Sequence, residues 1–297
     1  MPASYNETSA TLIGSIAVLL WGALALFTTW TGAIPPFQLV ALTFSVAFLL
    51  ALAKWIWRRQ NPFQFLRHPP VVWLFGICGL FGYHAFYFLA LKNAPVVEAG
   101  LIAYLWPLLI VLFSALLPGE KLRWFHIAGT LAGLAGTVAL VTNGGAVSFK
   151  SEYALGYGAA VACALTWSTY SVLSRRFEHV PTDTVGWFCG ATAVLGALAS
   201  WMFETPIWPD APEVWLGTLL LGLGPVGAAF FVWDIGMKRG NIRVLGAISY
   251  SAPLISTLLL IAFTGAHATG AVWFACVAIV GGAVLAAKNM IFGTSQS

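Results

Sequence analysis

The chain has 297 residues, of which 60% are hydrophobic and only 8% are charged, and its mean hydropathy is +0.86. Soluble domains carry about 25% charged residues, so this composition excludes a soluble enzyme and predicts an all-α integral membrane protein. The net charge of +4 fits an orientation signal in the membrane better than binding to an acidic partner or a nucleic acid.

Ten segments are apolar over about 20 residues, which is the length that a membrane helix needs. Turn-forming residues separate them, among them Pro35-Pro36, Asn61-Pro62 and Pro118-Gly119. The connecting loops are short, so we expect no separate domain outside the membrane. The predicted spans are residues 11–31, 36–55, 71–91, 95–117, 123–142, 154–174, 184–203, 214–236, 242–263 and 268–288.

Lysine and arginine fall almost entirely on one side of this predicted topology. The other side holds only Lys92 and Lys150. Because cytoplasmic loops carry the excess of basic residues, both termini are predicted to lie in the cytoplasm. The basic residues on the side of the termini are Lys54, Arg58, Arg59, Arg67, Lys121, Arg123, Arg175, Arg176, Lys238, Arg239, Arg243 and Lys288.

Part of the sequence is repeated. The segment Lys92–Pro107 resembles Lys238–Pro253 at an offset of 146 residues, and the same offset pairs Trp21 with Trp167. Chance matches of a residue as rare as tryptophan are infrequent, so the pairing carries weight. A doubled membrane chain is typical of transporters that are built from structural repeats.

The repeat divides the chain into two halves, residues 1–145 and 146–297, with five predicted spans in each. Because five is odd, the halves cross the membrane in opposite directions and form an inverted repeat. Substrate sites of such transporters lie near the middle of the membrane, between the halves. The turn that contains Glu120 in the first half has Ala266 in the second, so the turn motif is incomplete there.

Aromatic residues are the first candidates for a substrate site. The third span places Tyr83 and Tyr87 on one helical face, beside His84, which is the only histidine in the middle of a predicted span. Trp106 and Trp167 lie on the fourth and sixth spans, close to small residues. Each grouping fits either the wall of a cavity or close packing between helices. Aromatic walls with a few polar groups suit a ligand that carries an aromatic ring.

Two further aromatic residues are predicted substrate contacts because of their counterparts in the other half. Trp233 corresponds to Tyr87 at the 146-residue offset, and Tyr250 corresponds to Tyr104. On a continuous helix Tyr104 and Trp106 lie about 200° apart, so only one of them is expected to face the centre. We favour Trp106, whose counterpart is a small alanine, because an asymmetric site suits an asymmetric ligand.

Prolines mark candidate kinks and hinges. Pro107 and Pro253 lie inside the fourth and ninth spans. Proline lacks an amide hydrogen, so a carbonyl one turn earlier loses its helical partner. That carbonyl either lines the cavity and accepts a hydrogen bond from a substrate ammonium group, or accepts one from a neighbouring helix. Pro35 and Pro181, at the ends of spans, are candidate hinges for the two halves.

Charged residues within the predicted spans are few, and each has two interpretations. Asp234 fits either an ion pair with Lys238 or a site that couples transport to a proton or cation. Glu98 fits either a rim charge that reaches toward Lys92 or the same coupling role. Glu120 is expected to be solvated in its turn. Neither a metal-ligand spacing nor a cofactor motif occurs, so we expect no metal and no cofactor.

Several local motifs resemble a known group of transporters. Residues 98–107 read EAGLIAYLWP, residues 233–236 read WDIG, and a PGE turn follows the fourth span at residues 118–120. Together with ten short-looped spans, these motifs resemble the drug/metabolite transporter superfamily, its amino acid and metabolite exporter family, and the bacterial aromatic amino acid exporter branch. The resemblance covers nearly the whole chain. It implies efflux of Phe, Tyr and Trp across the bacterial inner membrane, through a central cavity reached by alternating access.

Other functions stay open. A multidrug exporter of lipophilic or quaternary cations would use the same aromatic residues, usually with a central carboxylate that the spans lack. A membrane enzyme would need a nucleophile with its base, or a metal site, and His84 alone is neither, so no enzyme is expected. Proton antiport and facilitated diffusion fit the sequence equally well. No obligate protein partner is evident besides the lipid bilayer.

Overall fold

The computed structural model describes residues 5–264 and 267–292, and the regular structure within those ranges is entirely helical. Eight helical segments of this described chain are long and apolar enough to cross a membrane, and each coincides with a predicted span. The fold is therefore that of a multi-pass helical membrane protein. The eight segments are Glu7–Thr29, Pro36–Trp57, Pro70–Asn93, Val96–Ser114, Trp124–Val141, Thr184–Phe203, Pro212–Arg239 and Ile242–Phe263.

Two more helices occupy the positions of the remaining predicted spans. The helix α9 (Ala154–Leu173) has 20 residues, and α15 (Gly270–Ala286) has 17. The helix α9 is long enough to cross a membrane but less apolar than the eight segments, and α15 is apolar but shorter. Both pack along their length against neighbouring helices. The incomplete turn motif at Ala266 lies outside the described residues.

Five of the long segments are interrupted rather than straight. The interrupted segments are α1 (Glu7–Gly22) with α2 (Leu24–Thr29), α4 (Pro70–Ile77) with α5 (Tyr83–Asn93), α6 (Val96–Ala103) with α7 (Trp106–Ser114), α11 (Pro212–Leu223) with α12 (Ala229–Arg239), and α13 (Ile242–Ile248) with α14 (Ser251–Thr264). The continuous helices are α3 (Pro36–Trp57), α8 (Trp124–Val141) and α10 (Thr184–Phe203), and the short α16 (Lys288–Phe292) follows α15.

Two of the interruptions are π-helical turns, at Cys78–Gly82 and Gly224–Ala228. A π turn adds one residue to a helical turn, redirects the side chains that follow, and often lies at a functional site. Two other interruptions come just before Pro107 and Pro253. Proline cannot continue the hydrogen-bond ladder but is well suited to the first turn of a new helix, so the chain restarts a helix there.

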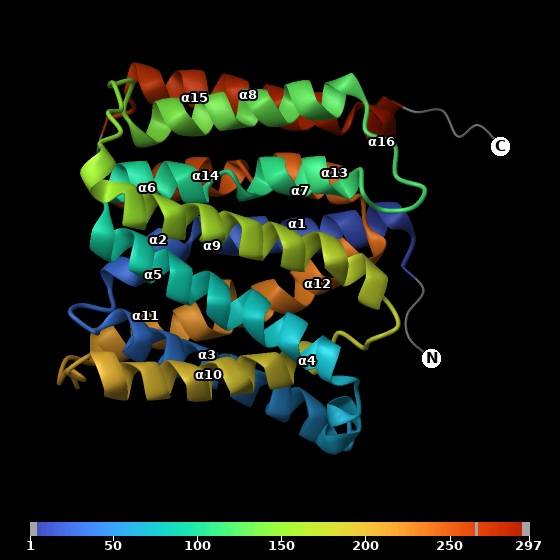
Figure 1. Cartoon of the computed structure of the whole chain (residues 1–297), viewed down its shortest axis with the longest axis vertical. Helices are drawn as coiled ribbons and strands as arrows, with labels where there is room; N and C mark the ends of the chain where they lie inside the picture. Colours follow the sequence, from blue (N-terminus) through green and yellow to red (C-terminus); the bar gives the residue numbers. More distant parts are fainter. Residues whose placement is uncertain (1–4, 265–266, 293–297) are drawn as a thin grey trace.

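The helices pair across the two predicted halves of the chain. The closest pairs are α3 with α10, α8 with α15, α1 with α12, and α5 with α9. Figure 1 shows α8 and α15 along one edge of the bundle and α3 and α10 along the opposite edge, with the other two pairs between them. At the α1–α12 crossing, a Cβ atom on Gly14 would lie 2.9 Å from the Cα atom of Gly236, so only glycine allows this approach.

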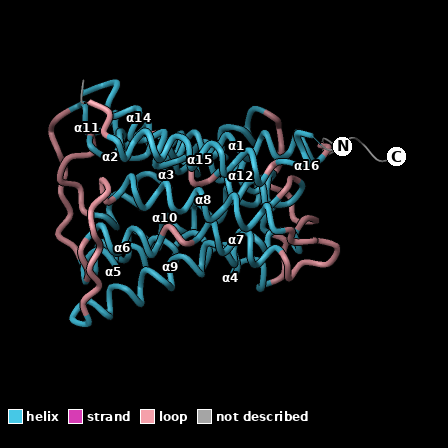
Figure 2. The backbone as a smooth tube through the Cα atoms, turned by 90° about the horizontal axis from the view of Figure 1, so that it is seen from above, coloured by secondary structure: helices cyan, strands magenta, loops and turns pink. Residues whose placement is uncertain are grey.

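The loops gather at two ends of the bundle, as Figure 2 shows. The helix α1 begins and α16 ends at the same end (Figure 1), which we call the terminal end. The other is called the opposite end. The predicted substrate residues of α5, α7, α9 and α12 lie between these two ends.

Candidate functional site

Four tryptophans meet in the centre of the bundle, and we call them the tryptophan cluster. The ring centroid of Trp21 lies 5.9 Å from that of Trp106, 5.7 Å from Trp167 and 5.0 Å from Trp233. Trp106 and Trp167 meet edge to face, with an interplanar angle of 90°. Such contacts join ring edges to ring faces, so the centre of the bundle offers both kinds of surface to an aromatic ligand.

The indole N–H groups of the cluster differ in their partners. Trp21 Nε1 donates to the carbonyl oxygen of Pro225, within the second π turn, at 3.0 Å. Trp233 Nε1 donates to Ser171 Oγ at 3.0 Å. Among the described residues, Trp106 Nε1 and Trp167 Nε1 have no hydrogen-bond partner, and neither nitrogen is fully enclosed by protein. A free donor inside a membrane protein needs water or a ligand, so these two groups point to a polar occupant.

The helix α5 places three predicted contacts beside the cluster. The Tyr83 ring lies 5.4 Å from Trp167 and stacks on Tyr87 at 6.1 Å, with an interplanar angle of 3°. His84 meets Tyr83 edge-on at 5.2 Å, and its Nδ1 lies 2.8 Å from the carbonyl oxygen of Leu80. The π turn ends immediately before Tyr83, so it sets the direction of all three side chains.

The position of Trp106 depends on the interruption between α6 and α7. The helix is interrupted at Tyr104 and Leu105, whose dihedral angles stay close to helical values (φ -67°, ψ 4° and φ -70°, ψ -15°). Trp106 lies in the cluster, as favoured from the sequence, and the expectation that Tyr104 faces elsewhere stays a prediction. Ser168 Oγ donates to the carbonyl oxygen of Trp106 at 3.3 Å and ties α7 to α9.

Exposure falls from the opposite end toward the terminal end. On α5, which runs toward the opposite end, Tyr83 and Tyr87 are partly exposed. The relative exposure then drops to 6% for Trp106, 3% for Trp167 and 1% for Trp233. Within this group of residues, exposure is therefore greatest at the two tyrosines of α5 and smallest at Trp233.

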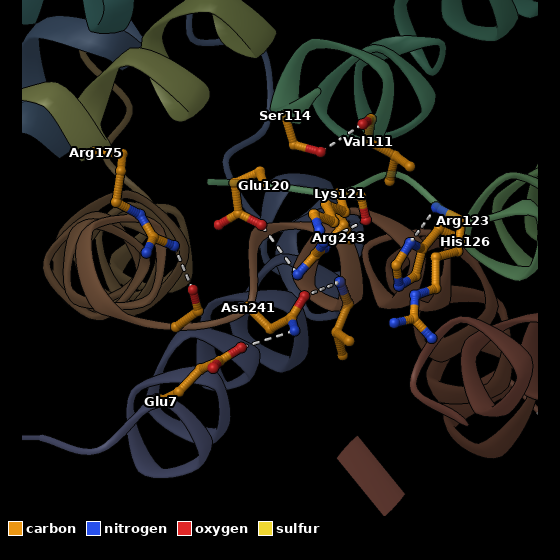
Figure 3. Close-up of polar contacts among 12 residues, drawn as sticks. Glu7, Val111, Ser114, Glu120, Lys121, Arg123, His126, Arg175, Asn241 and Arg243 are labelled. Carbon is orange, nitrogen blue, oxygen red and sulfur yellow. Dashed lines mark hydrogen bonds and ion pairs between the residues drawn. The ribbon is translucent and has the colours of Figure 1, made fainter. Parts of the chain in front are cut away.

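Long-range polar contacts close the terminal end, and Figure 3 shows them. Glu120 Oε2 lies 3.0 Å from Arg243 Nη2, and Arg243 Nη1 donates to the carbonyl oxygen of Lys121 at 2.7 Å. Asn241 Nδ2 donates to Glu7 Oε1 at 2.8 Å. The prediction that Glu120 is solvated is wrong: its side chain is 19% exposed, because the fold brings Arg243 from a distant part of the sequence against it.

Arg175 adds a further link at this end. Its Nε donates to the carbonyl oxygen of Met237 at 2.9 Å, and its Nη2 donates to that of Gly240 (Figure 3). Burial lowers the pKa of the Arg175 guanidinium, and the nearby carboxylates of Glu120 and Glu7 oppose that shift. The segment after α9 is thereby fastened to the turn between α12 and α13.

The contacts at the opposite end join edge helices instead. Glu204 accepts hydrogen bonds from the backbone N–H groups of Phe37 at 2.8 Å and Gln38 at 3.0 Å, at the start of α3. The Gln38 side chain also binds the backbone of Ile207. These contacts hold the start of α3 to the chain that follows α10.

Asp234 lies in a buried polar group at the terminal end. Its Oδ2 is 2.8 Å from Lys238 Nζ and accepts from Thr182 Oγ1 at 2.7 Å, while Lys238 Nζ donates to the carbonyl oxygen of Val180 at 2.9 Å. The Asp234 and Lys238 side chains are only 5% and 6% exposed. The predicted ion pair is confirmed, and it is more deeply buried than an interfacial pair.

Glu98 lies elsewhere, in the first turn of α6, where a carboxylate is stabilised by the positive end of the helix dipole. It is partly exposed, and Lys92 is exposed. The two side chains form no ion pair with each other in the described residues, and Glu98 occupies the helix N-terminus. The turn at Ala94 and Pro95 separates the two helices that carry them.

The structure does not bring every predicted residue to the tryptophan cluster. Tyr250 is fully buried in a separate group with Leu254, Ala275 and Ile279, and it packs on Gly133 of α8. It therefore lies between helices, beside α15.

The four predicted kink or hinge prolines lie at the starts of helices or in the turns before them. Pro107 and Pro253 begin the second parts of their interrupted helices. Pro35 precedes α3, and Pro181 lies in the turn before α10.

Trp21 is not among the predicted substrate contacts, yet its ring touches all three other members of the cluster. Its pairing with Trp167 at the 146-residue offset is the signal in the sequence that could have identified it. Ser168 and the polar contacts at the terminal end carry no comparable signal.

Comparisons with known proteins agree with this architecture. A profile of the EamA-like transporter family matches the chain twice, over residues 8–142 and 154–288. A protein of Ancylobacter novellus named aromatic amino acid exporter YddG is 57% identical over 95% of this chain and 98% of its own length. The Escherichia coli K12 protein of the same name is 26% identical, over 94% of this chain and 97% of its own.

A solved crystal structure is also similar. Its sequence is 57% identical, and the superposition has a TM-score of 0.89 over 94% of this chain and 97% of the other. A probable terminal-alkyne amino-acid exporter of Streptantibioticus cattleyicolor is more distant, at 24% identity over 92% of each chain. The chain therefore belongs to the EamA-like transporter family.

Proposed function

We propose that the chain exports aromatic amino acids across the bacterial inner membrane. The tryptophan cluster carries this proposal, because two of its indole N–H groups have no hydrogen-bond partner within the described part of the chain. Aromatic surfaces with a few polar groups suit a ligand that has both a ring and a polar head. The Ancylobacter novellus relative, which is 57% identical, is named as an aromatic amino acid exporter.

Within the site, we assign the substrate ring to a position beside the edge-to-face pair of Trp106 and Trp167, where Tyr83 and Tyr87 cover it from the opposite end. Trp233 supports Trp167 from behind, at a ring distance of 6.4 Å and an angle of 19°. We assign an indirect role to Tyr250, which is buried away from the cluster and holds the α13–α14 segment against α8 and α15.

All ten helices cross the membrane in this proposal, as two inverted halves at residues 1–145 and 146–297. The π turns support it, because Cys78–Gly82 and Gly224–Ala228 start 146 residues apart, at the offset of the sequence repeat. The helix pairs support it as well, because exchanging the halves converts α1–α12 into α5–α9 and leaves the edge pairs unchanged. The family profile also matches the chain twice.

The terminal end faces the cytoplasm in this proposal. Basic residues are concentrated in the loops of that end, and the positive-inside rule then sets the orientation. The entrance beside Tyr83 and Tyr87 accordingly faces the outside. In this proposal the structure is the outward-facing conformation, from which an exporter releases its substrate.

Export then requires the cytoplasmic end to open and the outer end to close. The contacts that must break are Glu120–Arg243 and Glu7–Asn241, which join helices of different halves. The edge pairs α3–α10 and α8–α15 stay packed and form the frame. The helix interruptions before Pro107 and Pro253, and the turns at Pro35 and Pro181, absorb the movement.

Asp234 is the first candidate for coupling to a proton, because it is a buried carboxylate beside the closed end. Glu98, at the rim of the opposite end, is the second. Efflux of Phe that is unchanged after collapse of the proton gradient would assign facilitated diffusion and remove both roles.

The test uses proteoliposomes loaded with labelled Phe or with a labelled quaternary ammonium drug. We expect saturable efflux of Phe and only background efflux of the drug, because the cluster offers rings but has no carboxylate among its members. Efflux of the drug alone would instead assign multidrug export, and efflux of neither would reject the proposed function.

A further inference from the structure

We propose that His84 is a specificity-determining residue that accepts a hydrogen bond from the α-amino group of the substrate. This inference rests on the proposed export of amino acids and names the group that recognises their charged nitrogen. The tryptophan cluster explains only the recognition of the ring.

The hydrogen bond of His84 fixes which ring nitrogen can accept. Nδ1 of His84 lies 2.8 Å from the carbonyl oxygen of Leu80, one turn earlier on the same helix. A carbonyl oxygen can only accept, so Nδ1 must carry the proton. In the neutral imidazole Nε2 is then unprotonated, and its lone pair points away from that bond.

The acceptor nitrogen is free and its direction is held. Among the described residues Nε2 of His84 has no hydrogen-bond partner, and it is not fully enclosed by protein. The ring is held edge-on by Phe44 at 5.2 Å and by Tyr83 at 5.2 Å. Phe44 is fully buried, so the imidazole has little room to turn. An acceptor that is oriented before binding loses little entropy when a ligand arrives.

The site needs such an acceptor, because an ammonium group without a partner is costly in the middle of a membrane protein. Asp234 is already bound by Lys238 and by Thr182, at the far side of the cluster. Glu98 lies in the first turn of α6, at the rim. The unprotonated nitrogen of His84 is on the same helix as Tyr83, whose ring touches Trp167 of the cluster.

The other half of the amino acid head has matching donors. The free N–H groups of Trp106 and Trp167 can donate to a carboxylate, while His84 accepts from the ammonium group. Neutral groups thus hold both ends of a zwitterion. Such a site needs no buried charge of its own, and a ligand that lacks the amino group leaves Nε2 of His84 unpaired.

The experiment compares Phe with 3-phenylpropionate, which has the same ring and carboxylate but no amino group. Dissociation constants are measured on the purified protein by quenching of intrinsic tryptophan fluorescence, so a variant with slow transport still gives a result. A hydrogen bond to a charged group is worth about 1.5–3 kcal/mol, so the wild type should prefer Phe by about tenfold or more.

Three variants test whether the preference for Phe over 3-phenylpropionate depends on His84. In His84→Phe the ratio of the two dissociation constants should fall close to one, whereas His84→Gln, which keeps an acceptor, should retain most of the preference. His179→Phe replaces an exposed histidine of the terminal end and should leave the ratio unchanged. If His84→Phe fails to fold, His84→Leu provides the same comparison, because it also removes both ring nitrogens.

The outcomes separate this inference from the proposed function. An unchanged ratio in His84→Phe or His84→Leu would overturn the role of His84, even with normal transport of Phe. An equal loss of preference in His84→Gln would overturn it as well. Absence of saturable Phe efflux from wild-type proteoliposomes would instead reject the proposed function.

Discussion

At the scale of single residues, Trp106 contributes both surface and position to the centre of the molecule. Its ring contacts Trp21, Trp167 and Trp233, and its carbonyl oxygen accepts from Ser168. Its side chain is nearly buried, so its removal would open a hole that the remaining rings cannot fill. Truncation of the Trp106 side chain should therefore weaken substrate binding more than it disturbs the packing of the edge helix pairs.

We predict that Trp106→Ala weakens Phe transport strongly. Truncation of a tryptophan that anchors a ligand costs about 2 kcal/mol or more, which lowers the apparent affinity by about thirtyfold. The measurement is the KM for Phe efflux from proteoliposomes. Trp124→Ala is the matched control, because Trp124 is 68% exposed at the start of α8. Equal KM values for Trp106→Ala and wild type would argue against a substrate site in the cluster.

The buried pair of Asp234 and Lys238 leads to a stability prediction. Asp234→Asn leaves the Lys238 ammonium buried without its counter-ion, and removal of one partner of such a pair costs about 3–5 kcal/mol. The double variant Asp234→Asn with Lys238→Met should recover much of that loss, because it removes both charges. Thermal unfolding in detergent checks both expectations. Equal melting temperatures for wild type and Asp234→Asn would contradict a structural role for the pair.

The same double variant separates the structural role of Asp234 from coupling. If Asp234 also carries the proton, the restored protein should still move Phe down its gradient but should no longer be driven by a pH gradient. The measurement is Phe accumulation in proteoliposomes with and without an imposed pH gradient. Gradient-driven accumulation by the double variant would remove Asp234 from the coupling mechanism.

At the scale of helices, the sequence predicted the positions of the spans but not their interruptions. Long apolar stretches and turn residues are local signals, and the eight long segments follow them closely. The π turn at Cys78–Gly82 packs against α9, and the sequence analysis did not predict it. The interruption at Tyr104 and Leu105 was not predicted either, although the wheel argument favoured Trp106, which does lie in the cluster.

Contacts between residues far apart in the sequence could not be predicted from it either. Tyr83, His84, Trp106 and Trp167 could be predicted as candidates because aromatic and imidazole groups stand out in apolar spans. The partner of Glu120 could not be predicted, because Arg243 lies on another helix far along the chain. The separate position of Tyr250 could not be predicted either, since the sequence repeat pairs it with Tyr104 without saying which helix covers it.

The α1–α12 crossing gives a prediction at this scale. In Gly14→Ala the new methyl group would meet backbone atoms of Gly236, which cannot move aside cheaply, so we expect a loss of about 1–3 kcal/mol in unfolding free energy. Gly158→Ala on α9 is the control, because no atom of another described helix or loop lies within 4 Å of its Cβ position. That variant should be neutral or slightly stabilising. Equal destabilisation of both variants, measured by thermal unfolding, would show that the close approach does not matter.

At the scale of the whole molecule, contacts between distant helices join the two halves at the terminal end, whereas those at the opposite end join the edge helices α3 and α10. The closing contacts are polar and partly exposed, and contacts of this kind contribute little net stability, so they can break and re-form. The edge pairs α3–α10 and α8–α15 are packed along their length and keep the two halves together (Figure 1). This division between a frame and a movable centre suits alternating access to one site.

Counterflow in proteoliposomes tests this account most directly. Vesicles that contain the protein are loaded with unlabelled Phe and placed in a trace of labelled Phe, and glycine-loaded vesicles serve as the control. A single alternating site predicts that internal Phe transiently drives accumulation of the label above its external concentration and that glycine does not. Label entry that is independent of the internal Phe would contradict alternating access by an aromatic amino acid exporter.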